Sequence, residues 1–117
     1  MAYTTKYNLK PVKSGNTFKG VAFEFFSEET EEPIFLENHS IKLQVRKNHN
    51  APIVELEKIY KAGGGILVDN NKVLIEPFKA NIPPGSYVYD IKLISPDGEE
   101  VKNNPEGTWE ILPIVTR

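Results

Sequence analysis

The chain has 117 residues, of which 39% are hydrophobic and 26% are charged, a composition typical of one folded domain rather than of a disordered chain. Fourteen basic and sixteen acidic side chains give a net charge of −2, which argues against nucleic acid as a partner, because phosphate backbones are bound by a broad positive field. The lack of cysteine excludes disulfides, a thiolate nucleophile and a zinc–thiolate site.

The first half of the chain is expected to form strands, because its segments alternate apolar and polar residues with a period of two between prolines and glycines. An early strand is expected at about Tyr7 to Val12. The next two strands each have one apolar face, made of Val21, Phe23 and Phe25 in one and of Ile41, Leu43 and Val45 in the other. A further strand is expected over residues 53–57, before a Gly63-Gly64-Gly65 break that we expect to be a flexible or bulged connection.

A tight hairpin follows in the predicted order of elements. Asp69-Asn70-Asn71 separates the apolar residues 66–68 from residues 73–75. Asparagine tolerates the positive φ that primed turns require. The two short strands are therefore expected to be antiparallel neighbours.

The longest strand is expected from Ser86 to Ser95, after a proline-rich corner at residues 82–85. Its inward face is expected to hold Tyr87, Tyr89, Ile91 and Leu93. A sugar-stacking platform is the alternative for the two tyrosines, but the alternation favours core packing. One tyrosine hydroxyl is expected to hydrogen-bond to the backbone at the corner. The last strand, residues 107–112, should turn Trp109 and Ile111 inward.

About seven to eight short strands at this spacing predict an all-β fold. We expect an immunoglobulin-like antiparallel β-sandwich that forms a single domain over residues 1–117. A small closed barrel is the alternative; it is less favoured because the longest strands have one apolar face each. Residues 1–6 lack the strand pattern, and we expect them to form an extended N-terminal arm.

The motifs of the chain predict no catalytic, cofactor or metal site. His39 and His49 each lie in a predicted turn, without a second ligand at metal spacing. The acidic run over residues 28–32 lacks the glycine and the alternating aspartates of a calcium loop, which favours a solvated hairpin tip. The other charged residues fall in turns and on wet strand faces. We therefore expect that the protein is not an enzyme and needs no cofactor.

A family resemblance covers the chain from Ile41 to Arg117. It is carried by residues 41–47 and 53–56, by the Ile82-Pro83-Pro84-Gly85-Ser86-Tyr87-Val88-Tyr89-Asp90 corner, by Ser95-Pro96-Asp97-Gly98, and by residues 107–113 with Val115-Thr116-Arg117. These segments resemble small immunoglobulin-like domains of tailed-phage structural proteins, and most of all the N-terminal domain of upper baseplate proteins. The acidic run at residues 28–32 and the triple-glycine break depart from the family pattern.

The resemblance implies a non-enzymatic structural virion protein, either a tail or baseplate component or a head-associated one. Such a protein would be assembled in the host cytoplasm, and its partners would be other virion proteins or copies of itself. The alternative is a cell-surface module that binds carbohydrate or protein through loops at one end of the sandwich. The N-terminus has no signal-peptide core and no stretch is long enough to span a membrane, so we expect no membrane partner.

Two sets of residues are candidates for the interface of such an assembly. Tyr3 and Tyr7 belong to the predicted N-terminal arm, which could add a strand to the exposed sheet edge of a neighbour. Val88, Ile94 and Leu112 are apolar residues expected on the outer faces of neighbouring strands, where they could form a contact patch.

Overall fold

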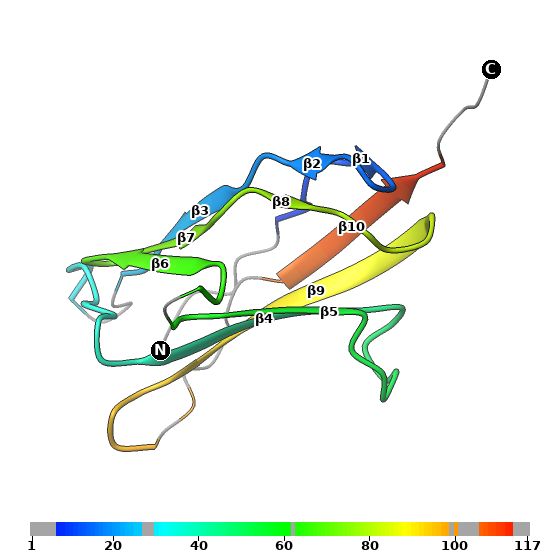
Figure 1. Ribbon diagram of the computed structural model, residues 1–117. Helices are drawn as coiled ribbons and strands as arrows, with labels where there is room; N and C mark the ends of the chain where they lie inside the picture. The colour runs from blue at the N-terminus through cyan, green and yellow to red at the C-terminus, as the bar shows by residue number, and fades with distance from the viewer. Residues whose placement is uncertain (1–6, 27–29, 62, 99, 101–105, 114–117) are drawn as a thin grey trace.

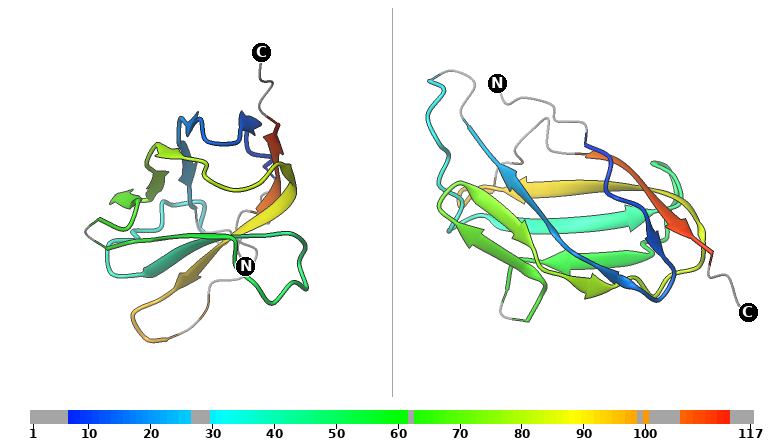
Figure 2. Two further views of the ribbon diagram at one scale, coloured as in Figure 1. Left: turned by 45° about the vertical axis from the view of Figure 1, so that its right-hand side comes forward. Right: turned by 90° about the horizontal axis from the view of Figure 1, so that it is seen from above.

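The computed structural model describes residues 7–26, 30–61, 63–98, 100 and 106–113. These residues form strands and turns, and none of them lies in a helix (Figure 1). The strands are arranged in two facing layers (Figure 2).

One layer is a five-stranded sheet in the order β1-β10-β9-β4-β5. It is antiparallel except at one edge, where β1 runs parallel to β10. Its members are β1 (Val12–Lys13), β4 (Ser40–Arg46), β5 (Leu56–Ile59), β9 (Gly85–Ile94) and β10 (Glu106–Leu112).

The other layer consists of a three-stranded sheet in the order β3-β7-β6 and the strand pair β2-β8. The two parts form one interrupted ladder, because the β2-β8 pair continues the β3-β7 pair in the same register. The interruption falls at Gly20 and at Pro77, which has no N–H to donate. The strands are β2 (Thr17–Phe18), β3 (Val21–Glu24), β6 (Ile66–Asp69), β7 (Lys72–Ile75) and β8 (Phe78–Lys79).

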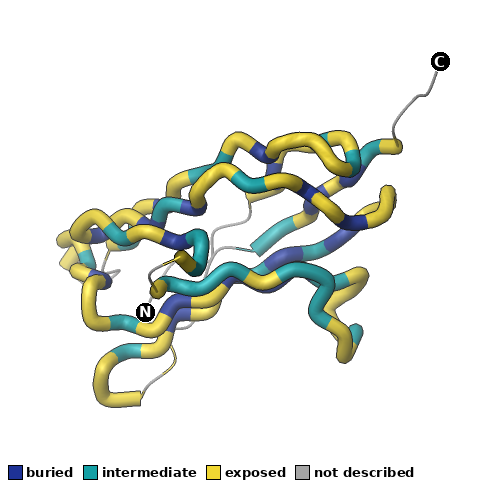
Figure 3. The backbone as a smooth tube through the Cα atoms, in the orientation of Figure 1, coloured by how far each residue is buried: buried dark blue, intermediate teal, exposed yellow. Residues whose placement is uncertain are grey.

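The core lies between the layers, where the inward faces of the strands are buried (Figure 3). Trp109 of β10 is fully buried and packs edge-on against Phe18 of β2 and Phe78 of β8, with ring centroids 5.2 and 5.8 Å apart. This aromatic cluster joins the two layers at one end of the sandwich. The predicted inward residues of β4, β9 and β10 are confirmed as core: Ile41, Leu43, Val45, Tyr87, Tyr89, Ile91, Leu93, Trp109 and Ile111.

The proline-rich corner before β9 is formed as the sequence predicts. The Tyr87 hydroxyl donates a hydrogen bond of 2.6 Å to the carbonyl of Pro83. A buried tyrosine at the start of this strand, bonded to backbone a few residues upstream, is the tyrosine corner of immunoglobulin-like sandwiches. The hairpin between β6 and β7 is also confirmed, and Asn70 has the positive φ, 55°.

Several sequence predictions differ from the structure. The described residues form ten strands where about seven to eight were expected, and the early strand expected at about Tyr7 to Val12 is formed only at Val12–Lys13. The strand expected over residues 53–57 begins later, at Leu56, and Ile53 is 66% exposed. The strand continues through Lys58, whose ammonium lies 4.4 Å from the centre of the Phe78 ring, so a charged residue occupies an inward position at the sheet edge. The triple-glycine segment includes a hydrogen-bonded turn, in which Gly64 donates to Lys61 (2.8 Å) and accepts from Ile59 (3.0 Å).

Candidate functional site

The groups that most often carry chemistry are dispersed in the described part of the chain. Its residues contain no group of three or more histidine, cysteine or acidic side chains that could hold a metal ion. His49 is exposed, whereas His39 is half-buried and its Nδ1 atom has no hydrogen-bond partner. Residues 30–32 of the acidic run are exposed, and Glu28 and Glu29 lie outside the described residues. No described helix could span a membrane.

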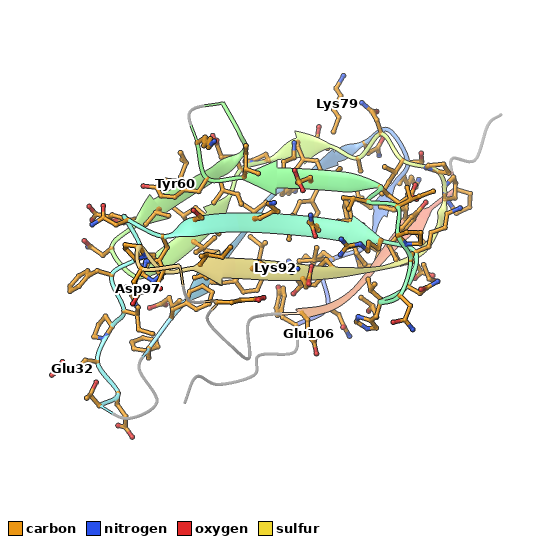
Figure 4. The ribbon with its side chains drawn as sticks, turned by 90° about the horizontal axis from the view of Figure 1, so that it is seen from below. Glu32, Tyr60, Lys79, Lys92, Asp97 and Glu106 are labelled. Carbon is orange, nitrogen blue, oxygen red and sulfur yellow. The ribbon has the colours of Figure 1, made fainter. Side chains whose placement is uncertain are left out.

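The apolar residues predicted on the outer strand faces are not brought together. Ile94 is the last residue of β9, and Val88 lies nearer its start, with Asp90 and Lys92 between them on the same face. Figure 4 shows Lys92 on this face of the sheet. Leu112 lies past the last β10-β9 residue pair, Ile111 with Gly85, and so beyond the start of β9. The three residues therefore do not form one continuous patch.

Tyr7 belongs to the sandwich and not to a free arm, which corrects the sequence prediction for this residue. Its N–H donates to the carbonyl of Glu106 (3.0 Å), and its carbonyl accepts a hydrogen bond of 2.5 Å from the buried Tyr89 hydroxyl. The Tyr7 ring packs edge-on against Phe23 at 5.7 Å. Tyr3 and the rest of the predicted arm, residues 1–6, lie outside the described residues.

The whole segment from Tyr7 to Lys13 is held against β10. The Leu9 N–H donates to the Thr108 carbonyl (2.9 Å), and the Trp109 indole donates to the Lys10 carbonyl (3.0 Å). Gly107 is required for this close approach, because a Cβ at that position would collide with the carbonyl of Tyr7. The segment of residues 7–13, which ends in β1 and which we call the first strand, therefore lies along the edge of the five-stranded sheet.

This attachment leaves a cleft at the edge of the sandwich, which we call the edge cleft. It has a volume of about 550 Å³ and is lined by Tyr7 and residues 9–12 on one side and by residues 17–22 on the other. The side with Tyr7 and residues 9–12 lies along the five-stranded sheet, and the other side belongs to β2 and β3. The cleft therefore opens between the two layers of the sandwich.

The lining of the edge cleft combines apolar surface with positive charge. Val12 and Val21 are half-buried there, and the Tyr7 side chain is 40% exposed. Lys10 and Lys19 also line the cleft, and no acidic side chain is among the described residues that do so. The surface is thus suited to a partner that offers apolar side chains and negative charge.

The edge cleft was not anticipated from the sequence. Val21 belongs to the predicted apolar face and is half-buried, and its neighbour Ala22 is exposed. What makes them part of a cleft is that β3 has β7 as its neighbour and no described strand on its other side. No local sequence pattern specifies which edge of a strand stays unpaired.

The topology defines the class of fold to which the chain belongs. One layer places the β2/β3, β7/β8 and β6 strands side by side, and the other contains β10, β9, β4 and β5, which is the distribution of strands in an immunoglobulin-like β-sandwich. The tyrosine corner at the start of β9 agrees with it.

Comparison with known proteins gives no family for this chain. No protein-family model matches the chain, and no curated protein matches it in sequence. Among solved structures, CopC from Methylosinus trichosporium OB3b is similar at 16% identity and a TM-score of 0.47, over 92% of this chain and 86% of CopC. Murine CRIg is similar at 13% identity and a TM-score of 0.30, over 98% of this chain and 96% of CRIg.

Proposed function

We propose that this domain is a non-enzymatic structural protein that acts through protein–protein contacts, and that the edge cleft is its contact surface. The observation that carries the proposal is the free edge of β3 beside an apolar, positively charged cleft. Unpaired strand edges are templates for pairing with another chain, and proteins that remain monomeric usually cover or block them.

The more specific form of the proposal is a component of a phage virion, in the tail, the baseplate or the head. Its support is the sequence resemblance of Ile41 to Arg117 to tailed-phage structural domains. Virion substructures are built from repeated contacts in rings and fibres, so one small domain with a pairing edge can serve at every symmetry position.

Particle composition tests this function. Particles are purified from a producing culture and from the same culture with the gene for this chain deleted, and mass spectrometry gives the copy number of the chain relative to the major particle protein. We expect a fixed whole-number ratio set by the symmetry of a ring or fibre. Absence of the chain from intact particles would contradict the virion role.

A further inference from the structure

We infer that a partner binds the edge cleft by β-strand addition: an extended segment with alternating apolar and acidic residues pairs with the free edge of β3. This inference rests on the proposed function, since it gives the chemistry of the partner at the same surface. Its basis is the direction of the β3 backbone groups, the apolar lining of the cleft and the charge around it.

The backbone groups at the free edge can be assigned from the hydrogen bonds on the other side of β3. The Phe25 N–H donates to the Asn71 carbonyl (2.9 Å), and β3 pairs with β7 in antiparallel register. In such a ladder the bonding direction alternates along the strand, so Phe23 and Phe25 bond toward β7. The N–H and C=O groups of Ala22 and Glu24 therefore point away from β7, toward the free edge.

Among the described residues, no backbone hydrogen bond joins the opposite side of the cleft to these groups of β3. The segment from Tyr7 to Lys13 already directs its backbone hydrogen bonds to β10. Both Ala22 and Glu24 are exposed, and β7 is the only described strand that pairs with β3. A segment entering the cleft could thus accept from and donate to β3 without displacing a described backbone bond.

The size and lining of the cleft fit an extended chain. The β2-β3 side of the cleft covers residues 17–22, and six residues of extended chain span about 20 Å. Alternate side chains of an added strand would face inward, against the half-buried Val12 and Val21. Main-chain bonds to an edge and pockets for alternate side chains are the two components of recognition by strand addition.

The charge at the cleft favours an acidic segment over the N-terminal segment of a second copy of this chain. Lys10 and Lys19 line the cleft, and an added segment would lie beside both. The exposed Glu24 is the one acidic side chain of β3, and it lies outside the lining of the cleft. The N-terminal segment Met1-Ala2-Tyr3-Thr4-Thr5-Lys6 contains a lysine and no acidic residue. Lys6 of that segment would add a like charge beside Lys10 and Lys19, so the N-terminal segment of a neighbouring copy is a poorer occupant than an acidic segment.

Peptide binding to the full chain tests the inference. The probe is an end-blocked peptide of alternating valine and aspartate; one comparison peptide has lysine in place of aspartate, and another has the sequence of residues 1–6. NMR titration and amide hydrogen exchange report affinity and location. We expect the acidic peptide to bind about tenfold more tightly than either comparison peptide, a difference typical of charge complementarity, and to slow exchange at Ala22 and Glu24.

Variants of the free edge separate strand addition from nonspecific attraction. Ala22→Pro removes an N–H that points to the free edge and leaves the bonds to β7, and proline is tolerated on strand edges. It should weaken acidic-peptide binding about tenfold, whereas Ala22→Thr, which keeps the N–H, should not. If Ala22→Pro does not fold, Lys19→Glu supplies the same test by weakening the acidic peptide and strengthening the lysine peptide. The matched control for Lys19→Glu is Lys92→Glu, because Lys92 lies on the outer face of β9 in the five-stranded sheet.

Several outcomes would overturn the inference. They are absence of acidic-peptide binding, protection at residues other than those of β3, or equal binding by Ala22→Pro. Tighter binding of the peptide of residues 1–6 would instead assign the cleft to a second copy of the chain. If the chain is found in purified particles while the peptides fail, strand addition is wrong and the structural function stands.

Discussion

At the scale of single residues, buried hydroxyl and indole groups hold the first strand in place. Tyr89 is 1% exposed and its hydroxyl donates to the Tyr7 carbonyl at 2.5 Å. Burial raises the pKa of Tyr89, with Tyr7 and Glu106 adding to the shift, so the hydroxyl keeps its proton and remains a donor at physiological pH. One core residue thus connects β9 to the segment that forms a wall of the edge cleft.

Replacement of this hydroxyl tests its role. Tyr89→Phe should lower the free energy of unfolding by about 1 kcal/mol, the net value of a typical hydrogen bond, and should speed amide exchange at Leu9. Urea unfolding and hydrogen exchange measure the two effects. Tyr60→Phe is the control, because the Tyr60 hydroxyl bonds to no described residue and the ring is half-buried. Equal losses in both variants would contradict a specific role for the Tyr89 bond.

His39 gives the stability a dependence on pH. Burial lowers the pKa of His39 below 6.5, although the nearby Asp97 raises it in part. The unfolded chain therefore takes up the proton first, so stability is highest above the unfolded pKa and falls as the pH drops through 6.5 toward the lower folded pKa. Unfolding free energies measured between about pH 7.5 and 5 should show this fall. The slope should decrease in His39→Gln and persist in His49→Gln, whose histidine is exposed. An unchanged slope in His39→Gln would refute the assignment.

At the scale of elements, the β6-β7 hairpin depends on one left-handed residue. Asn70 has φ of 55°, a conformation that asparagine and glycine adopt more readily than other residues. Its carbonyl also accepts a hydrogen bond from the Leu36 N–H (2.9 Å), so the turn holds a neighbouring segment in place.

Two substitutions separate the conformational effect from the loss of the side chain. Asn70→Ala should lower the free energy of unfolding by about 1 kcal/mol, because a Cβ-bearing residue without a polar side chain is strained there. Asn70→Gly removes the same side chain without strain and should be close to neutral. Thermal and urea unfolding of both variants measure the difference; equal destabilisation would show that the side chain and not the φ angle matters.

The strands with long alternating patterns could be predicted from the sequence, whereas the connections that create the site could not. Residues Ile41 to Val45 and Tyr87 to Leu93 alternate over enough positions to specify their inward faces. The strands β2 and β8 have two residues each and carry no periodicity. The Ser14 N–H donates to Leu112 and the Gly15 N–H to Ala80 (2.9 and 2.8 Å), so the chain crosses between the layers at the turn of residues 14–16, which no local sequence pattern indicates.

At the scale of the whole molecule, the edge cleft follows from the layer that the first strand joins. Because residues 7–13 join β10 rather than β3, one layer gains an edge strand and the other keeps a free edge. Gly107 and the Trp109 indole favour this choice, the first by admitting the Tyr7 carbonyl and the second by bonding to Lys10. The residues that stabilise the fold are therefore also the residues that keep the proposed binding edge open.

Two truncations distinguish a role of the N-terminus in folding from a role in assembly. Deletion of residues 1–6 retains Tyr7, whereas deletion of residues 1–8 also removes the bonds of Tyr7 to Glu106 and Tyr89 and that of Asn8 to Thr108. The longer deletion should be less stable than the shorter one by about 2 kcal/mol, the net value of two or three hydrogen bonds, as measured by urea unfolding. Equal stability would show that Tyr7 and Asn8 do not hold the first strand.

The same pair of variants decides what a change in assembly means. If the mass in solution or incorporation into particles changes with the shorter deletion while its unfolding free energy stays that of the full chain, the N-terminal residues, Tyr3 among them, contact a partner. If assembly changes only with the longer deletion and in step with stability, the effect comes from loss of the first strand. In that case the wall of the edge cleft formed by Tyr7 and residues 9–12 is disrupted as well, so the acidic peptide should also fail to bind.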